Sequence, residues 1–130
     1  MRKALLAVSL GLVLMLATVA CSGSSAPAAS TPGSSASGGT TLNVGMAEMK
    51  FTPNTWTAKA GQPITVNVTN NGTVLHDWEV VGMESQTRVE AQPGKSGSIT
   101  FTIAQAGTYQ VICSQPGHAA AGMTGTLTVQ

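Results

Sequence analysis

Residues 42–130 contain many short runs in which apolar and polar side chains alternate, and this two-residue period limits the possible folds more than any other feature. In 64–69 (ITVNVT) and 98–103 (SITFTI) every second residue is apolar, which is typical of a β-strand with one buried face. Similar runs lie at 41–46, 77–81, 108–113 and 125–129, with another around Trp56. No long helical period is present; only a short helical turn is expected, between Met83 and Ala91.

Turn sequences separate these runs. They read GQP at 61–63, NNG at 70–72, QPG at 92–94 and PG at 116–117, and such clusters of Gly, Pro and Asn end strands. About seven or eight short strands at this spacing predict an all-β fold, a Greek-key sandwich or barrel.

The N-terminal residues 1–20 predict a targeting segment. Positive charges at Arg2 and Lys3 precede an apolar run at 4–20 that is short for a membrane span. A small residue before Cys21 resembles a bacterial lipoprotein signal, in which Cys21 becomes the acylated first residue. An uncleaved anchor and an ordinary secretory signal are the alternatives. In every case the chain leaves the cytoplasm, and the lipoprotein reading places it on the periplasmic or cell-surface side of a bacterial membrane.

The next segment predicts a tether. Residues 22–41 are only Ser, Gly, Ala, Thr and Pro, so they offer no large side chain to bury. We therefore expect three parts: a signal segment at 1–20, an acylated cysteine with a flexible tether at 21–41, and a folded domain at 42–130.

Composition excludes nucleic acid as a partner. Six Lys and Arg stand against five Asp and Glu, and the aromatic residues number two Phe, two Trp and one Tyr. This gives neither a basic field for a phosphate backbone nor a stacking platform for bases. Only two His and two Cys remain as candidates for chemistry.

Three of the candidate residues lie together near the C-terminus. Cys113, His118 and Met123 have the spacing Cys-x4-His-x4-Met at the end of a predicted strand and in the loop after it, and His76 begins another strand. The turn at 116–117 would let His118 reach the same ion as Cys113. One thiolate, two imidazoles and one thioether are the ligands of a blue-copper site.

Each of these residues also has a structural interpretation. Cys113 and Met123 are apolar enough to be core residues, His118 could be a surface histidine, and His76 a buried structural one. A free thiol is a liability outside the cytoplasm, however, and the other cysteine, Cys21, is predicted to be acylated. This favours the metal-ligand interpretation.

The motifs resemble those of the cupredoxins, the type 1 blue copper family. Residues 107–118 (GTYQVICSQPGH) are similar to the family's C-terminal copper loop with azurin-like Cys-to-His spacing, and 120–125 (AAGMTG) resembles plastocyanin. Residues 70–77 (NNGTVLHD) resemble the first-histidine loop, and the combination is most similar to the auracyanins. The resemblance covers 42–130 and implies one copper ion alternating between Cu(I) and Cu(II). It implies these ligands: His76, Cys113 and His118 as strong ones and Met123 as a weak axial one.

The resemblance also suggests an interaction behind the ligands. In this family an Asn commonly follows the first His and bonds to the residue after the Cys. Here Asp77 takes that place and Ser114 follows Cys113. Our hypothesis is that the Asp77 carboxylate accepts a hydrogen bond from Ser114 and that its negative charge favours Cu(II), lowering the reduction potential.

Small uncharged residues surround His118. In the family the edge of this histidine reaches the surface within an apolar patch, which suits a weak docking face for redox proteins such as a cytochrome or another electron-transfer complex. The residues expected to form this face are Pro116, Gly117, Ala119, Ala120 and Ala121.

The sequence thus predicts a monomeric, membrane-tethered one-electron carrier. Four protein ligands leave no open position for a substrate, so we do not expect an enzyme, and two His cannot supply a second copper centre. The main alternative is an extracytoplasmic copper-binding or delivery lipoprotein without redox turnover, although such a site would more naturally be open and rich in Met and His. A metal-free sandwich lipoprotein is the remaining alternative.

Overall fold

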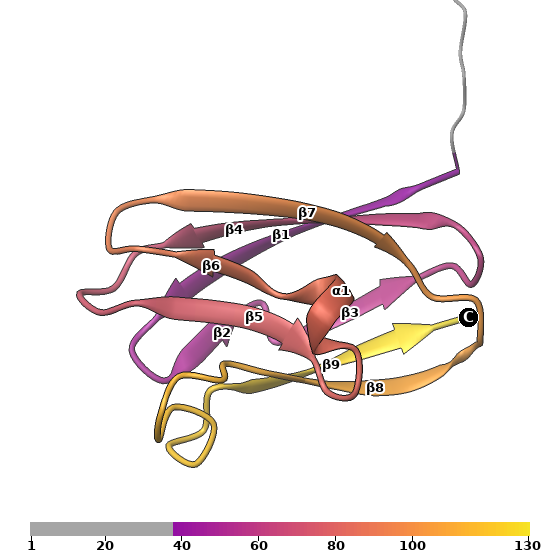
Figure 1. The fold of residues 1–130 in the computed structure, drawn as a ribbon. Helices are drawn as coiled ribbons and strands as arrows, with labels where there is room; N and C mark the ends of the chain where they lie inside the picture. Colours follow the sequence, from indigo (N-terminus) through magenta and orange to yellow (C-terminus); the bar gives the residue numbers. More distant parts are fainter. Residues whose placement is uncertain (1–37) are drawn as a thin grey trace, which may run out of the picture. The chain divides into compact units, whose positions relative to one another are not determined.

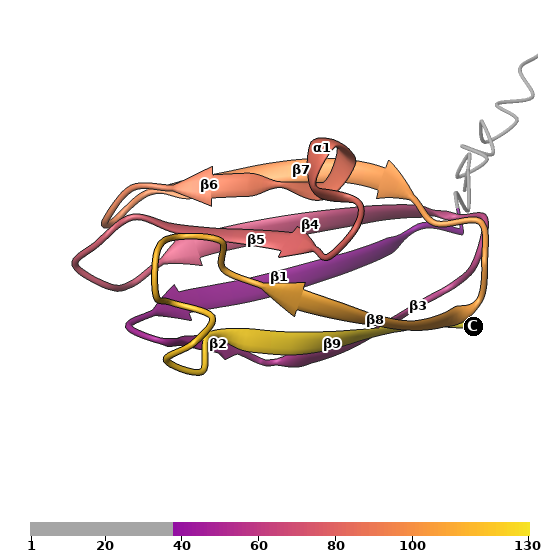
Figure 2. The same ribbon diagram turned by 60° about the horizontal axis from the view of Figure 1, so that its bottom comes forward.

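Two β-sheets face each other in the computed structural model, which describes residues 38–130 (Figures 1 and 2). The predicted signal segment, Cys21 and most of the predicted tether lie outside the described residues. One sheet has the order β2-β1-β4-β7 and the other β3-β9-β8-β5-β6. The first sheet comprises β1 (Thr40–Ala47), β2 (Lys50–Thr52), β4 (Pro63–Asn70) and β7 (Ser96–Thr102). The second comprises β3 (Thr55–Ala58), β5 (His76–Val80), β6 (Val89–Ala91), β8 (Gly107–Ile112) and β9 (Thr124–Val129).

The core lies between the sheets and follows the sequence alternation. In β4 Ile64, Val66 and Val68 are fully buried, whereas the intervening residues are partly or fully exposed. The ring of Trp78, at the centre of β5, lies 5.8 Å from that of Trp56 and 6.0 Å from that of Phe101. The alternating runs therefore paired as expected, and the prediction of an all-β sandwich is confirmed.

Residues 38–130 form nine strands rather than the seven or eight expected. The two additional ones, β2 and β6, have three residues each, which is too short for a period of two to be recognised. A four-residue helix, α1 (Glu84–Thr87), lies inside the segment where a helical turn was expected. No helix within residues 38–130 is long and apolar enough to span a membrane. β1 begins at Thr40, two residues before the predicted domain boundary.

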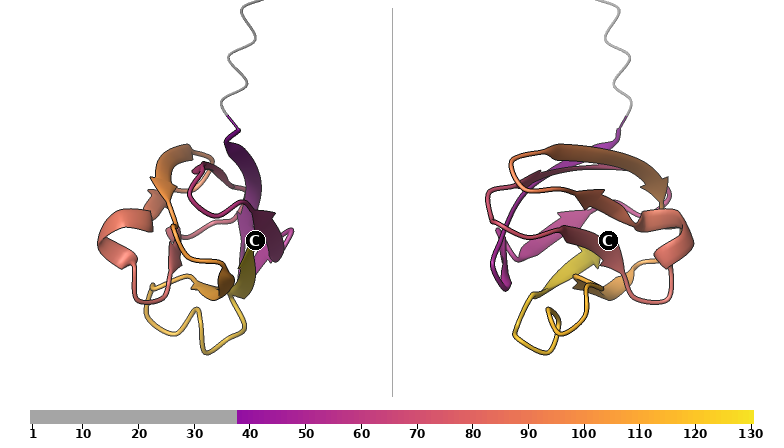
Figure 3. Two further views of the ribbon diagram at one scale, coloured as in Figure 1. Left: turned by 90° about the vertical axis from the view of Figure 1, so that its right-hand side faces the viewer. Right: turned by 60° about the vertical axis from the view of Figure 1, so that its left-hand side comes forward.

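Strand pairing brings the candidate ligands to one end of the sandwich. β5 begins at His76 and pairs antiparallel with β8, which ends at Ile112, one residue before Cys113. β8 in turn pairs antiparallel with β9, which begins just after Met123. The loop at 113–123 therefore projects from the same end as the start of β5 (Figure 3).

Candidate metal centre

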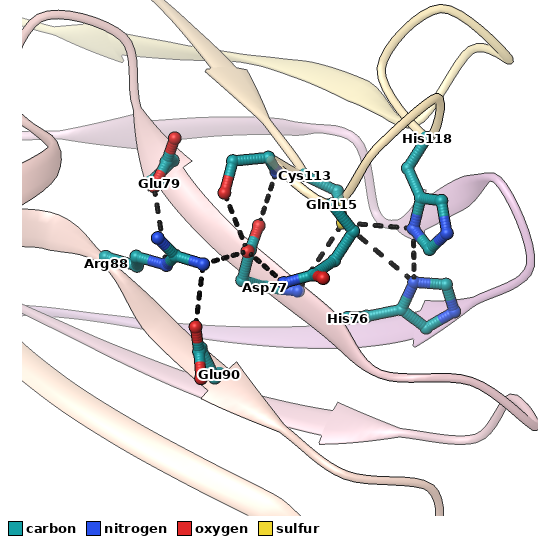
Figure 4. A network of polar contacts seen from close by, with 9 residues as sticks. His76, Asp77, Glu79, Arg88, Glu90, Cys113, Gln115 and His118 are labelled. Carbon is teal, nitrogen blue, oxygen red and sulfur yellow. Dashed lines mark hydrogen bonds and ion pairs between the residues drawn. The ribbon is translucent and has the colours of Figure 1, made fainter.

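Three side chains converge at this end of the sandwich, one from the first residue of β5 and two from the loop at 113–123 (Figure 4). The Cys113 Sγ atom lies 3.3 Å from Nδ1 of His118 and 4.0 Å from Nδ1 of His76, and the two Nδ1 atoms are 3.2 Å apart. Cys113 and His76 are buried, and His118 is half-buried. Both imidazoles thus present the same ring nitrogen to one sulfur atom.

The size of this triangle suits a metal ion. The point equidistant from the three atoms lies about 2.1 Å from each of them, compared with the ~2.0–2.3 Å bonds that imidazole nitrogen and thiolate sulfur form with an ion such as zinc. A trigonal set of two His and one Cys is the arrangement typical of a blue-copper ion. The donor atoms present therefore fit copper both in kind and in spacing.

The backbone of Met123 connects it to both ligands of the loop. Its carbonyl oxygen accepts a hydrogen bond from the Cys113 N–H at 3.1 Å, and its own N–H donates to the His118 carbonyl at 3.0 Å. Gly117 and Gly122 have φ angles of +83° and +104°, a region that suits glycine and lets the loop turn twice within a few residues. The Met123 side chain is fully buried. Its role as the axial ligand stays a prediction.

Asn70 shapes the loop that leads to His76. The buried Asn70 side chain donates to the carbonyl oxygens of Val74 and Ala91, each at 2.8 Å, and accepts from the Gly72 N–H at 2.9 Å. These bonds hold both sides of the turn against β6. Such side-chain-to-backbone bonds are the usual way in which Asn fixes a loop.

Asp77 connects the two ligand loops. Its carboxylate accepts hydrogen bonds from the N–H and the hydroxyl of Ser114, at 2.6 and 2.8 Å, so the bond expected from the sequence is present. Its own N–H points to Cys113 Sγ at 3.5 Å. Burial opposes ionisation of Asp77, but the bonds from Ser114 and Gln115 and the charge of Arg88 outweigh it and lower the pKa.

Sequence reasoning missed two residues of this network. The Gln115 amide donates to Asp77 Oδ2 at 2.9 Å, and an Arg88 guanidinium nitrogen lies 3.0 Å from the same oxygen. The position of Gln115, two residues after Cys113, was an available signal. Arg88 had none, because its contact depends on the pairing of β5 with β6, in which Asp77 lies opposite Glu90.

Burial shifts the pKa values of His76 and Cys113 with opposite consequences for metal binding. Burial, followed by repulsion from His118, lowers the pKa of His76, so its imidazole is neutral and free to coordinate at pH 7. Burial raises the pKa of the Cys113 thiol in the metal-free protein. A metal ion that binds there must therefore displace the thiol proton.

The loop residues expected to form a docking face lie around His118. Pro116, Gly117, Ala120 and Ala121 are exposed, and Ala119 is half-buried like His118. Val74, in the loop before β5, adds an apolar side chain that is 41% exposed. The exposed residues of the loop around His118 are thus small and uncharged, and a larger apolar side chain is exposed in the loop before β5.

Comparisons with known proteins agree with this geometry. The family model for the cupredoxin-like domain matches residues 11–129. Auracyanin-A of Chloroflexus aurantiacus is 32% identical and the alignment covers 91% of both chains, and the copper-resistant cuproprotein CopI of Rubrivivax gelatinosus is 29% identical over 76% of this chain and 72% of that protein. The solved structure of an auracyanin from Roseiflexus castenholzii superimposes with a TM-score of 0.62 at 26% identity, covering 70% of this chain and 97% of that one. The family match, the fold and the three converging donors lead to one conclusion: the chain belongs to the cupredoxin family.

Proposed function

We propose that the protein is a one-electron carrier with a single type 1 copper ion, held strongly by His76, Cys113 and His118 and weakly by Met123. The observation that carries this proposal is the triangle of one sulfur and two nitrogen atoms at one end of the sandwich. Copper bound there would supply a Cu(II)/Cu(I) couple that accepts and releases one electron.

The surrounding chain suits electron transfer better than catalysis. Cys113 and His76 are buried and follow or begin hydrogen-bonded strands, so the protein holds one arrangement for both oxidation states. Four protein ligands leave no position for a substrate, and we therefore propose no enzymatic activity. His118 is half-buried among small residues, which allows close approach of a redox partner such as a cytochrome. A monomer is proposed, since such transient contacts require an open face.

Copper loading of the soluble domain tests this function. We expect an intensely blue oxidised form that bleaches on reduction and returns on reoxidation, with reversible one-electron electrochemistry. A protein that binds only colourless Cu(I) would contradict the carrier. That outcome would support copper delivery instead, a second candidate favoured by the similarity to the copper-resistant cuproprotein CopI.

We also propose that the chain is anchored to the outside of a bacterial membrane through acylated Cys21, with 22–41 as a tether. Cys21→Ser removes the acylation site, so the full-length protein should move from the membrane fraction to the soluble fraction of the expressing cells, because a lipid anchor supplies the membrane affinity. Ser30→Ala is the matched control and should stay in the membrane fraction. Retention of Cys21→Ser in the membrane would argue for an uncleaved anchor.

A further inference from the structure

Arg88 lies at the centre of a charge cluster on the outer side of β5 (Figure 4). One of its guanidinium nitrogens lies 3.0 Å from Asp77 Oδ2 and 2.7 Å from Glu90 Oε1, and its Nε lies 3.8 Å from Glu79 Oε2. Every ion pair within residues 38–130 involves Arg88. A single cation therefore forms ion pairs with three carboxylates, one of which belongs to Asp77, the residue next to the ligand His76.

The chain before Arg88 holds it in this place. Thr87, the last residue of α1, is fully buried; its hydroxyl donates to the Met83 carbonyl at 2.9 Å and accepts from the Val80 N–H at 3.0 Å. These two bonds fasten α1 to the end of β5. Arg88 follows at once with extended backbone and enters β6 beside β5. The fold thus fixes the backbone at Arg88, and the side chain, 43% exposed, reaches from there to the carboxylates on β5 and β6.

The carboxylates that Arg88 contacts are unusual in their burial. The side chains of Asp77 and Glu79 are 0% and 4% exposed, whereas that of Glu90 is 49% exposed. Glu79 Oε2 has no hydrogen-bond partner, so Arg88 is its only neutralising contact within the described residues. Buried carboxylates without a counter-charge are costly, and their field acts on the nearby site with little screening by solvent.

A hydrogen-bonded path leads from Arg88 to the ligands. The Asp77 oxygen that Arg88 contacts also accepts from the Ser114 hydroxyl and from Gln115, and the Asp77 N–H points to Cys113 Sγ. Holding this carboxylate in place therefore holds the residues after Cys113. Changes in charge at Arg88 act on the same region.

We propose that Arg88 is a positioning residue of the metal centre: it fixes the Asp77 carboxylate against the Cys113 loop and offsets its negative charge, which raises the reduction potential of the copper site. This inference rests on the proposed function. Its chemistry is electrostatic, because a positive charge near the ion disfavours the more positive Cu(II) state relative to Cu(I).

The reduction potential of Arg88→Gln tests the charge. Glutamine keeps a hydrogen-bond donor but no charge, so the equilibrium should shift toward Cu(II) by about three- to tenfold at low ionic strength. Arg88→Lys retains the charge and should restore most of the wild-type potential. Lys59→Gln removes one positive charge from the exposed β3–β4 turn at the opposite end of the sandwich and should leave the potential nearly unchanged. A potential for Arg88→Gln equal to that of Lys59→Gln would overturn the charge role.

Amide hydrogen exchange in the metal-free protein tests the positioning without copper. The Ser114 N–H, bonded to Asp77 Oδ1 at 2.6 Å, should exchange about tenfold faster in Arg88→Gln, while amides in β4 keep their protection. Unchanged exchange at Ser114 would overturn the positioning role. Failure of the proposed function can be distinguished from failure of this inference. If the proposed function is wrong, the wild-type protein itself forms no blue, reversible copper site, whereas the exchange measurement still tests the positioning role of Arg88.

Discussion

Replacing Cys113 with serine is expected to abolish the blue oxidised form and to weaken copper binding by more than about 100-fold. Losing a residue that only hydrogen-bonds to a metal ligand typically lowers metal affinity by about 10–100-fold, and losing the ligand itself should lower it further. Cys113 Sγ is the atom toward which both Nδ1 atoms point, at 3.3 and 4.0 Å. A serine hydroxyl at this position stays protonated and is a hard donor, so it replaces neither the charge nor the softness of a thiolate. The visible spectrum after copper addition and a competition titration with a chelator measure the two effects.

The control for this substitution is a second sulfur-containing residue outside the centre. Met83 is partly buried and packs against the core, so Met83→Leu should keep the blue form and the copper affinity. Cys113 is fully buried, so its replacement could affect folding as well as copper binding. Urea unfolding of metal-free Cys113→Ser checks this, and we expect the domain still to fold. A folded Cys113→Ser protein with an intense blue form would rule out Cys113 as the ligand responsible for the colour.

The parts of this structure that could be predicted are those that local sequence encodes. Alternation located the long strands such as β4 and β7, and the spacing of Cys113 and His118 placed two donors on one loop. His76 could be included because residues 70–77 resemble the family's first-histidine loop, and the pairing of β5 with β8 found in the structure explains how it reaches Cys113. Each of these features depends on a motif of a few residues that are close in the chain.

The electrostatic surroundings of the site could not be predicted in the same way. In β5 the polar residues Asp77 and Glu79 alternate with apolar ones, which normally indicates a face in water. The structure buries all five residues of the strand, because the side chains of Arg88, Ser114 and Gln115 contact Asp77 on that face and Arg88 also reaches Glu79. This burial depends on the pairing of β5 with the three-residue strand β6 and on the long side chain of Arg88. Neither feature produces a periodic pattern in the sequence.

The Asp77→Asn variant is expected to raise the reduction potential, by about 59 mV if the Cu(I)/Cu(II) equilibrium shifts tenfold. Asp77 is fully buried; its backbone N–H contacts Cys113 Sγ, and its carboxylate oxygens accept hydrogen bonds from Ser114. Because the substitution removes the negative charge of this carboxylate, Cu(II) loses stabilisation relative to Cu(I). Redox titration of the copper-loaded protein measures the change. A fall, or no rise, would reject the role of this charge.

The geometry of asparagine also sets a cost in stability. Asp77 accepts from Ser114 twice, from Gln115 and from Arg88, whereas an amide has one accepting oxygen. Ser114 Oγ and Gln115 can reorient to accept from the new NH₂ group, but the guanidinium of Arg88 can only donate. We therefore expect unfolding of metal-free Asp77→Asn to become easier by roughly 1–3 kcal/mol. The double variant Asp77→Asn with Arg88→Gln removes both the buried negative charge and the guanidinium that lost its acceptor. Its reduction potential should therefore lie between those of the two single variants. Its loss of stability should be less than the sum of the losses in the two single variants.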